Sequence, residues 1–359
     1  GSWLGKRVLD PTCGSGAFLV ALIRRIRDEA IKAKWSSDKI VRHLCTSVWG
    51  FDLNPLAVQT ARVNFLMELA ELLKISPGQE LEIPVLLADA IYSPAPDPEI
   101  GQDVVKYQIG SQVAGLDITL PAALAFNRVR LDQVFAHMGD SVENDLNYKD
   151  AENQLMASEL ISSYEADDWR PAMKHTYNQI LNLHRKQWNG IWFRIVRNFF
   201  WSATAGHFDC IVVNPPWVRW SKLPDAYRER VKPTCERYGI FSKNKRHGGN
   251  ELDISAMITY TTSDKWLKEN GRLAFVITGT IFKNPSSAGF RNFKLNPSND
   301  KSLNLIPICV DDMKALKPFS DAANHTVVAV FDKSKRSGKY PVPYRLWDSA
   351  PGFTKAIPP

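Results

Sequence analysis

The sequence predicts an α/β fold with a mostly parallel sheet, because short apolar runs alternate with amphipathic helical segments near its start. Apolar residues recur at three- and four-residue spacing from Phe18 to Ala30, and Asn54-Pro55 is a typical helix start. Strand, helix and strand at this spacing favour right-handed parallel crossovers. Seven apolar runs are expected to be strands, namely residues 7–9, 48–52, 85–88, 208–213, 273–278, 305–310 and 326–331.

This alternation is interrupted between residues 94 and 206. The segment begins proline-rich and polar, and from Ala151 onward it carries apolar residues at helical spacing. We therefore predict a helical insertion subdomain, residues 94–206, between two halves of one core, residues 1–93 and 207–348. Residues 349–359 are expected to form a loose tail.

Composition excludes several classes of protein. The 359 residues carry a net charge of +7, and 44% of them are hydrophobic, which is an ordinary globular mixture. We expect no membrane association, since no apolar run approaches the roughly 20 residues of a membrane helix and no signal peptide is apparent. Five cysteines are scattered without a Cys-x-x-Cys pair. This favours a reducing cytoplasm and predicts neither a disulfide framework nor a metal site.

Positive charge is concentrated in residues 218–250, which we call the basic segment. It holds nine Lys or Arg and three acids, a net charge of +6, with four aromatic residues interleaved. Basic side chains neutralise phosphates, while aromatic rings stack on bases or anchor a loop. The pattern predicts a DNA-binding surface, with a solvated basic surface as the alternative. The candidate DNA-binding residues are Arg219, Trp220, Lys222, Lys243, Lys245 and Arg246.

Three acids follow successive predicted strands. Asp10 precedes a glycine-rich turn, where it would repel a pyrophosphate but suits a ligand with a positively charged amino acid group. A dinucleotide site is disfavoured, because Leu19 stands where the third glycine of that fingerprint would be. Asp52 can accept hydrogen bonds from ribose hydroxyls, and Asp89 from an adenine amine. Each acid alone could be an ordinary cap or turn, but three in order favour one cofactor site.

A rigid turn, Asn214-Pro215-Pro216-Trp217, follows the predicted strand 208–213. Its two prolines each fix a φ angle. The Asn214 side-chain oxygen and the Pro215 carbonyl can both accept from one amine, which would orient its nitrogen toward a methyl donor. Trp217 offers a flat face to a base taken out of a duplex. The alternative is a plain strand-end turn with a core tryptophan.

The stretch Asp10-Pro11-Thr12-Cys13-Gly14-Ser15-Gly16-Ala17-Phe18-Leu19 resembles the first motif of the adenine-N6 DNA methyltransferases. Asp52, Asp89 and the Asn214 turn match later motifs, in an order that resembles the gamma group. Residues 253–255, which are expected to open a helix, and residues 270–278 resemble the fifth and sixth motifs. Residues 290–291, 319–322 and 326–331 resemble the later part of large type I and type IIG restriction–modification methylases. The resemblance covers residues 8–93 and 208–347 and leaves the insertion unassigned.

The resemblance implies a Rossmann-like class I methyltransferase fold, with a seven-stranded, mostly parallel sheet and one antiparallel strand near its end. It implies S-adenosylmethionine as cofactor and transfer of its methyl group to the N6 amine of a flipped adenine in double-stranded DNA. Restriction–modification or phage defence is the implied setting, with other restriction or defence subunits as partners. The implied cofactor-binding residues are Asp10, Pro11, Thr12, Gly14, Gly16, Phe18, Asp52, Leu53, Asp89 and Ala90. The implied catalytic residues are Asn214, Pro215, Pro216 and Trp217.

Some positions depart from the family pattern, and other functions remain open. Trp217 replaces the commoner Tyr or Phe, and Val213 stands where glycine is frequent. The family's N-terminal helical region and a target-recognition domain are not recognised, so weak activity of this chain alone is expected. The alternatives are glutamine methylation of a protein, cytosine-N4 methylation, and a non-catalytic DNA-binding role. The long insertion disfavours the first, and serine is more usual than Asn214 in the second.

Overall fold

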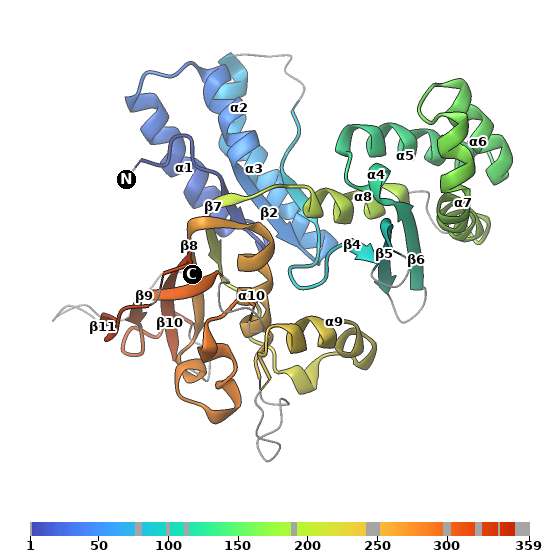
Figure 1. The fold of residues 1–359 in the computed structure, drawn as a ribbon. Coiled ribbons are helices and arrows are strands. Elements are labelled where there is room, and N and C mark those ends of the chain that lie inside the picture. Colours follow the sequence, from blue (N-terminus) through green and yellow to red (C-terminus); the bar gives the residue numbers. More distant parts are fainter. Residues whose placement is uncertain are drawn as a thin grey trace. The chain divides into compact units, whose positions relative to one another are not determined.

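The computed structural model describes residues 2–75, 81–97, 101–110, 115–187, 192–241, 252–296, 303–319, 325–336 and 338–348. The chain divides into two compact units (Figure 1). The first comprises Gly1–Val85, Asp89–Tyr92 and His207–Pro359, and the second Leu86–Ala88 and Ser93–Gly206. The predicted tail, and the candidates Lys243, Lys245 and Arg246, lie outside the described residues.

The first unit is built on an eight-stranded sheet with the order β11-β9-β10-β8-β7-β1-β2-β3, in which the last two residues of β3, Leu86 and Leu87, belong to the second unit. Strand β1 is parallel to β2 and β7, and β7 is parallel to β8. Strand β10 is antiparallel to both its neighbours, while β11 is parallel to β9. The strands are β1 (Val8–Asp10), β2 (Val48–Asp52), β3 (Val85–Leu87), β7 (Phe208–Val213), β8 (Leu267–Thr278), β9 (Asn304–Asp312), β10 (Thr326–Ser334) and β11 (Tyr344–Leu346).

The sheet confirms the predicted α/β class and the single antiparallel strand near the end. All seven predicted strands are present, and β2 and β7 have the predicted bounds. The predicted number of strands is wrong, because β11 adds an eighth. Its three residues are all exposed, so it carries no apolar signal. Strand β8 begins six residues earlier than predicted. Residues Lys268–Asn270 near its start are exposed and polar, so they give no apolar signal for a strand.

Helices α1 (Ala17–Lys32), α2 (Ser37–Ser47) and α3 (Pro55–Ile75) pack on one another and against β2 (Figure 1). The predicted start of α3 is confirmed, since the Asn54 side-chain oxygen accepts from the Leu56 amide at 2.9 Å. Helix α2 was not predicted, and its N-cap is Ser36, which accepts from the Lys39 amide. Within the described ranges, no helix is both long enough and apolar enough to cross a membrane.

Helix α10 (Ile254–Trp266) lies against β8 and is buried along almost its whole length (Figure 1). The Asp253 side chain caps its first turn by accepting from the Ser255 amide at 2.9 Å, as the predicted helix start requires. At its other end the buried Lys333 ammonium donates to the carbonyls of Ser263, Asp264 and Leu267. Both ends of α10 are therefore satisfied by side chains, which makes it a fixed support for the turns it touches.

The second unit has its own antiparallel sheet, of strands β4 (Ala95–Asp97), β5 (Gly101–Gly110) and β6 (Gly115–Pro121). The insertion predicted as a helical subdomain, residues 94–206, therefore also contains strands, and its helices begin at Ala122, well before Ala151. Strand β6 alternates exposed and buried residues, and the Thr119 amide donates to Thr176 in α7. The helices are α4 (Ala122–Ala125), α5 (Arg128–Glu143), α6 (Tyr148–Ala157), α7 (Ser163–Arg185) and α8 (Trp192–Ala203).

Candidate cofactor and amine site

The candidate site lies at the carboxyl edge of the first unit's sheet. Asp10 and Asp52 are the last residues of the neighbouring parallel strands β1 and β2, and Asp89 follows β3 by two residues. The Asn214 turn follows β7, which pairs with the other side of β1. Carboxyl ends of parallel strands meet at one edge, where open α/β sheets bind ligands. The structure therefore brings all four predicted motifs to the same edge.

Asp10 is a buried acid, with 2% of its surface exposed. Its Oδ1 accepts from the Thr12 amide at 3.1 Å. Burial raises the pKa of Asp10 to about 8, despite that hydrogen bond, and the negative charge of Asp52 adds to the shift. A cation placed beside Asp10 would reverse this shift by stabilising the carboxylate. The site is thus suited to a positively charged ligand group.

Asp52 organises the glycine-rich turn. Its Oδ2 accepts from the Gly14 amide at 2.9 Å, and its Oδ1 from the Asn54 amide at 2.8 Å. Each oxygen has a second lone pair, which leaves capacity for ribose hydroxyls. Beside it, Leu53 is 52% exposed, so its side chain is accessible for contact with a flat apolar ligand.

Gly16 begins helix α1 at φ +89°, in the left-handed region. A Cβ at this position would lie 3.2 Å from the Ala61 Cβ of α3, so a side chain would meet both strain and crowding. The start of α1 has no side-chain cap. Its first amides therefore remain available to a ligand, as at other glycine-turn sites. Phe18 is partly buried in that first turn, and Pro11 is buried before it.

Asp89 is 5% exposed, and three donors converge on its Oδ1. They are the Ile91 amide at 2.8 Å, the Tyr92 amide at 3.1 Å and the Tyr227 hydroxyl at 3.2 Å. Burial raises the pKa of Asp89, while these donors and the Lys265 ammonium act in the opposite sense. Tyr227 belongs to helix α9 (Asp225–Arg237), so a helix of the basic segment contacts one of the predicted cofactor-binding acids.

Helix α10 supports the same turn from a second side. The Thr261 hydroxyl donates to the Ala90 carbonyl at 2.8 Å, and the Lys265 ammonium donates to the Ile91 carbonyl at 2.8 Å. Burial lowers the pKa of Lys265 to about 8, although Asp89 favours its charged form. Sequence reasoning missed Tyr227, Thr261 and Lys265 as parts of this site. The one available sequence signal is that Tyr227 is among the four aromatic residues of the basic segment.

The Asn214 turn is open to solvent where chemistry would need it. Asn214 and Pro216 are exposed, whereas Pro215 is buried. The Asn214 carbonyl accepts from the Thr12 hydroxyl at 3.4 Å, which ties this turn directly to the glycine-rich turn. After the turn, the Val218 carbonyl accepts from the Ile254 amide at 2.8 Å. The Asn214 turn is therefore held between the glycine-rich turn and the start of α10.

Trp217 is half-buried beside this turn. Its indole N–H points to the Val276 carbonyl of β8 at 3.5 Å, and its ring lies edge to face with Phe319 at 5.5 Å between centroids. Phe319 is itself 41% exposed. Two aromatic rings therefore line the edge next to Asn214. Of the stretch 319–322 that matched a late family motif, only Phe319 lies within the described residues.

The described part of the basic segment only partly fits a DNA surface. Arg219 and Lys222 are exposed, as predicted for phosphate contacts. Trp220 is a correction: it is 8% exposed and packs edge-on against Phe241 at 5.1 Å, so its ring anchors the loop and presents no face for base stacking. Two further cations are already paired, Arg228 with Asp225 and Arg237 with Asp264. The net charge of the segment therefore overstates the charge that is available to phosphates.

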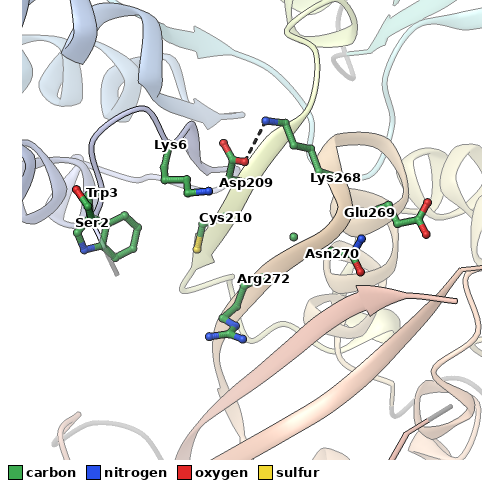
Figure 2. A pocket seen from close by; sticks show the side chains of 10 residues that line it. Ser2, Trp3, Lys6, Asp209, Cys210, Lys268, Glu269, Asn270 and Arg272 are labelled. Atoms are coloured by element: carbon green, nitrogen blue, oxygen red, sulfur yellow. Dashed lines mark hydrogen bonds and ion pairs between the residues drawn. The ribbon is translucent and has the colours of Figure 1, made fainter. Parts of the chain in front are cut away.

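A cavity of about 340 Å³ lies at the opposite, amino edge of the same sheet (Figure 2). It is lined by residues before β1 and by the first residues of β7 and β8, among them Lys6, Asp209 and Arg272. Asp209 is paired with Lys268 at 3.0 Å. No predicted site residue lines this cavity, so the candidate site rests on the converging motifs at the carboxyl edge.

A family model for Eco57I restriction-modification methylases matches residues 46–311 of the chain. The chain belongs to this family. The matched stretch includes Asp52, Asp89, the insertion and the Asn214 turn, whereas Asp10 and the glycine-rich turn precede it. The chain accordingly has the predicted Rossmann-like α/β methyltransferase fold, with one strand more than predicted. Curated protein sequences give no match.

Several solved structures are similar to this methylase-family chain at low identity. One is the type ISP restriction-modification enzyme LlaGI in complex with a DNA substrate mimic, at 13% identity and a TM-score of 0.49, covering 95% of this chain and 21% of that one. Another is a modification subunit of a putative type I restriction enzyme from Vibrio vulnificus YJ016, at 12% identity and a TM-score of 0.43, covering 98% and 44%. A third is a putative class I S-adenosylmethionine-dependent methyltransferase from Listeria monocytogenes, at 11% identity and a TM-score of 0.42, covering 96% and 59%. The chain thus spans about a fifth of the LlaGI structure.

Proposed function

We propose that this chain is the catalytic core of a DNA methyltransferase, which transfers a methyl group from S-adenosylmethionine to the N6 amine of adenine. The observation that carries the proposal is the meeting of Asp10, Asp52, Asp89 and the Asn214 turn at one sheet edge, with Thr12 bonded to the Asn214 carbonyl. Membership of the Eco57I methylase family supports a role in restriction–modification. Phage defence and partner subunits of the same system belong to this proposal.

The residues present fit the proposed cofactor. Asp10 is a buried carboxyl whose charged neighbour is another acid, Asp52, so the methionine ammonium group would supply the missing positive charge. Asp52 retains lone pairs for the ribose, and Leu53 is exposed beside it. Asp89 and Ala90 would face the adenine ring. S-adenosylmethionine would supply a methyl group on a positively charged sulfur, which leaves readily as a thioether.

The chain's own task in the reaction is positioning. The adenine amine would donate its two hydrogens to the Asn214 side-chain oxygen and the Pro215 carbonyl, which directs its lone pair at the methyl carbon. The new N–C bond forms as the C–S bond breaks, the electron pair stays on sulfur, and the extra amine proton passes to water. Trp217 and Phe319 would hold the flipped base by aromatic contact, which offsets part of the unstacking cost of a few kcal/mol.

Exposed cations beside the turn would contact DNA phosphates. Arg219 follows Trp217 by two residues and Lys222 lies in the short helix Trp220–Lys222, both exposed. Lys243, Lys245 and Arg246 remain proposals from the sequence. Phosphate contacts position a duplex without reading its bases, so they would serve any target sequence.

The proposal is tested by incubating the protein with S-adenosylmethionine and unmethylated DNA of mixed sequence, then mapping modified bases by single-molecule sequencing. We expect N6-methyladenine in one recurrent sequence context. Modified cytosine would reassign the target base, and DNA without any modified base would contradict DNA methylation. A calorimetric titration with S-adenosylmethionine tests the cofactor separately, and a reaction without it is the control.

A further inference from the structure

The turn after β3, Asp89 to Tyr92, is supported by side chains of two helices that lie far away in the sequence. The Tyr227 hydroxyl of α9 reaches the Asp89 carboxylate at 3.2 Å across 138 positions of sequence. From α10, Thr261 and Lys265 donate to the Ala90 and Ile91 carbonyls, each at 2.8 Å. The α10 contacts hold the backbone of the turn, whereas the Tyr227 contact holds the acid itself.

The distribution of donors distinguishes the two oxygens of Asp89. Its Oδ1 already accepts from the Ile91 amide, the Tyr92 amide and the Tyr227 hydroxyl. A carboxylate oxygen has two lone-pair sites, so three donors saturate it. The three donors to Oδ1 therefore orient the carboxylate, and Oδ2 is the oxygen that remains for a ligand.

Tyr227 is well suited to orient this acid. Burial and the negative charge of Asp89 raise the pKa of Tyr227, so its hydroxyl keeps its proton and stays a donor. Among the described residues, Tyr227 is the only side chain that donates a hydrogen bond to Asp89, since the other two donors are amides of the same turn. Without Tyr227, the donors that remain from this set are two amides of the turn itself, and the carboxylate loses its hydrogen bond to α9.

We propose that Tyr227 is a positioning residue for cofactor recognition, which orients Asp89 so that its Oδ2 accepts a hydrogen bond from the 6-amino group of the cofactor's adenine. The inference rests on the proposed function for its cofactor, and it adds a residue from α9 to the adenine subsite. It predicts that Tyr227 contributes to affinity through that amino group alone.

The experiment compares two ligands on one variant, Tyr227→Phe. One ligand is S-adenosylhomocysteine, and the other is its analogue in which purine, lacking the 6-amino group, replaces adenine. We expect Tyr227→Phe to raise the Kd for S-adenosylhomocysteine about tenfold, because one hydrogen bond of an ionised acceptor is misdirected. The Kd for the purine analogue should stay unchanged. Both are measured by calorimetry on the whole chain.

A matched control is Tyr238→Phe, at the C-terminal end of the same helix. The Tyr238 hydroxyl donates to Asp264 of α10 at 2.6 Å, so this variant also removes a partly buried tyrosine–aspartate hydrogen bond, between the C-cap of α9 and α10. It should change the two Kd values by equal factors. A cooperative thermal transition of both variants establishes that they are folded.

Three results would overturn the inference. Equal weakening of both ligands by Tyr227→Phe would mean that Tyr227 only stabilises the turn. Unchanged binding of both would mean that it does not act on the site. If the unsubstituted protein binds the two ligands equally, Asp89 does not read the amino group, while the cofactor assignment stands. If that protein binds neither ligand, the proposed cofactor itself is wrong.

Discussion

The two edges of the central sheet both carry acids, but the acids are neutralised in different ways. At the amino edge, Asp209 is bonded to the Lys268 ammonium at 3.0 Å and to the Arg7 amide at 2.8 Å. Burial acts against its ionisation, yet these partners hold the pKa of Asp209 below its usual value. At the carboxyl edge, Asp10 accepts from a backbone amide, lies beside another acid, and has a pKa of about 8.

This difference favours the carboxyl edge as the place where a ligand binds. An acid paired with a lysine is already satisfied, whereas a buried acid next to another acid gains most from a cation supplied from outside. The cavity at the amino edge is lined by charged residues too, but Asp209 is paired with Lys268, as Figure 2 shows, and Arg272 is paired with Asp332. Charge satisfaction therefore distinguishes the edges better than the volume of the cavity does.

The largest expected effect is that of Asn214→Ala at the carboxyl edge. We expect at least about a hundredfold loss of methylation rate, because one of two acceptors for the amine is removed. Binding of S-adenosylmethionine should be unchanged. The matched control is Asn270→Gly at the amino edge, where φ is +63° and glycine fits without strain. Methylation near the original rate by Asn214→Ala, measured with radiolabelled cofactor, would remove the Asn214 turn from the mechanism.

The next largest effect is expected from Gly16→Ala at the carboxyl edge, compared with Gly5→Ala before β1. Gly16→Ala should cost about 1–2 kcal/mol of folding free energy for the left-handed φ, with more for crowding against Ala61, and should weaken cofactor binding. Gly5, before β1, has φ +78° and open space around it. Gly5→Ala should therefore show the conformational cost alone. Urea unfolding and cofactor titration of both variants measure the difference, and equal losses of affinity would contradict a specific role for the glycine-rich turn.

Asp10 predicts a pH dependence of cofactor binding. Because its pKa is raised to about 8 in the free protein, a cationic ligand must ionise it, so affinity should fall as pH drops below 8, by at most about tenfold per unit. The same shift lowers stability of the free protein as pH rises from about 4 to 8. Asp10→Asn should flatten both profiles, whereas Asp209→Asn should leave the binding profile in place. Ionisation of the ligand itself affects all three proteins equally, so a difference between their binding profiles comes from Asp10.

The smallest effect is expected from Lys268→Ala at the amino edge. Its partner Asp209 is partly exposed, so the pair should stabilise the fold by no more than about 1 kcal/mol. Folding lowers the pKa of Asp209. The contribution of the pair is therefore present at pH values above the pKa of Asp209 in the unfolded chain, and it is lost as pH falls through the lower pKa of the folded state. Denaturant unfolding at pH 7 and pH 3 measures it, with methylation unaffected. A large loss of methylation would show that the two edges are not independent.

Local signals accounted for much of this molecule. Strands β2 and β7 have the bounds that their apolar runs predicted, and the Asn54-Pro55 helix start and the Asp253 cap are present. The missed elements lack such signals: β11 is exposed throughout, and the β5–β6 hairpin lies in the proline-rich and polar first part of the insertion. Trp220 was misassigned because an aromatic residue in a basic segment gives no sign of whether its ring is buried.

By itself the sequence determined the strand–turn motifs and their order, because a turn's prolines, glycines and terminal acids act within a few residues of one another. That was enough to predict the fold class and the acids of the candidate site. Only the tertiary structure decided which groups those acids meet: Thr12 with the Asn214 carbonyl, and Tyr227 with Asp89. These partners are separated by 202 and 138 positions, and no local pattern records a hydrogen bond that exists only once the sheet has brought distant strands together.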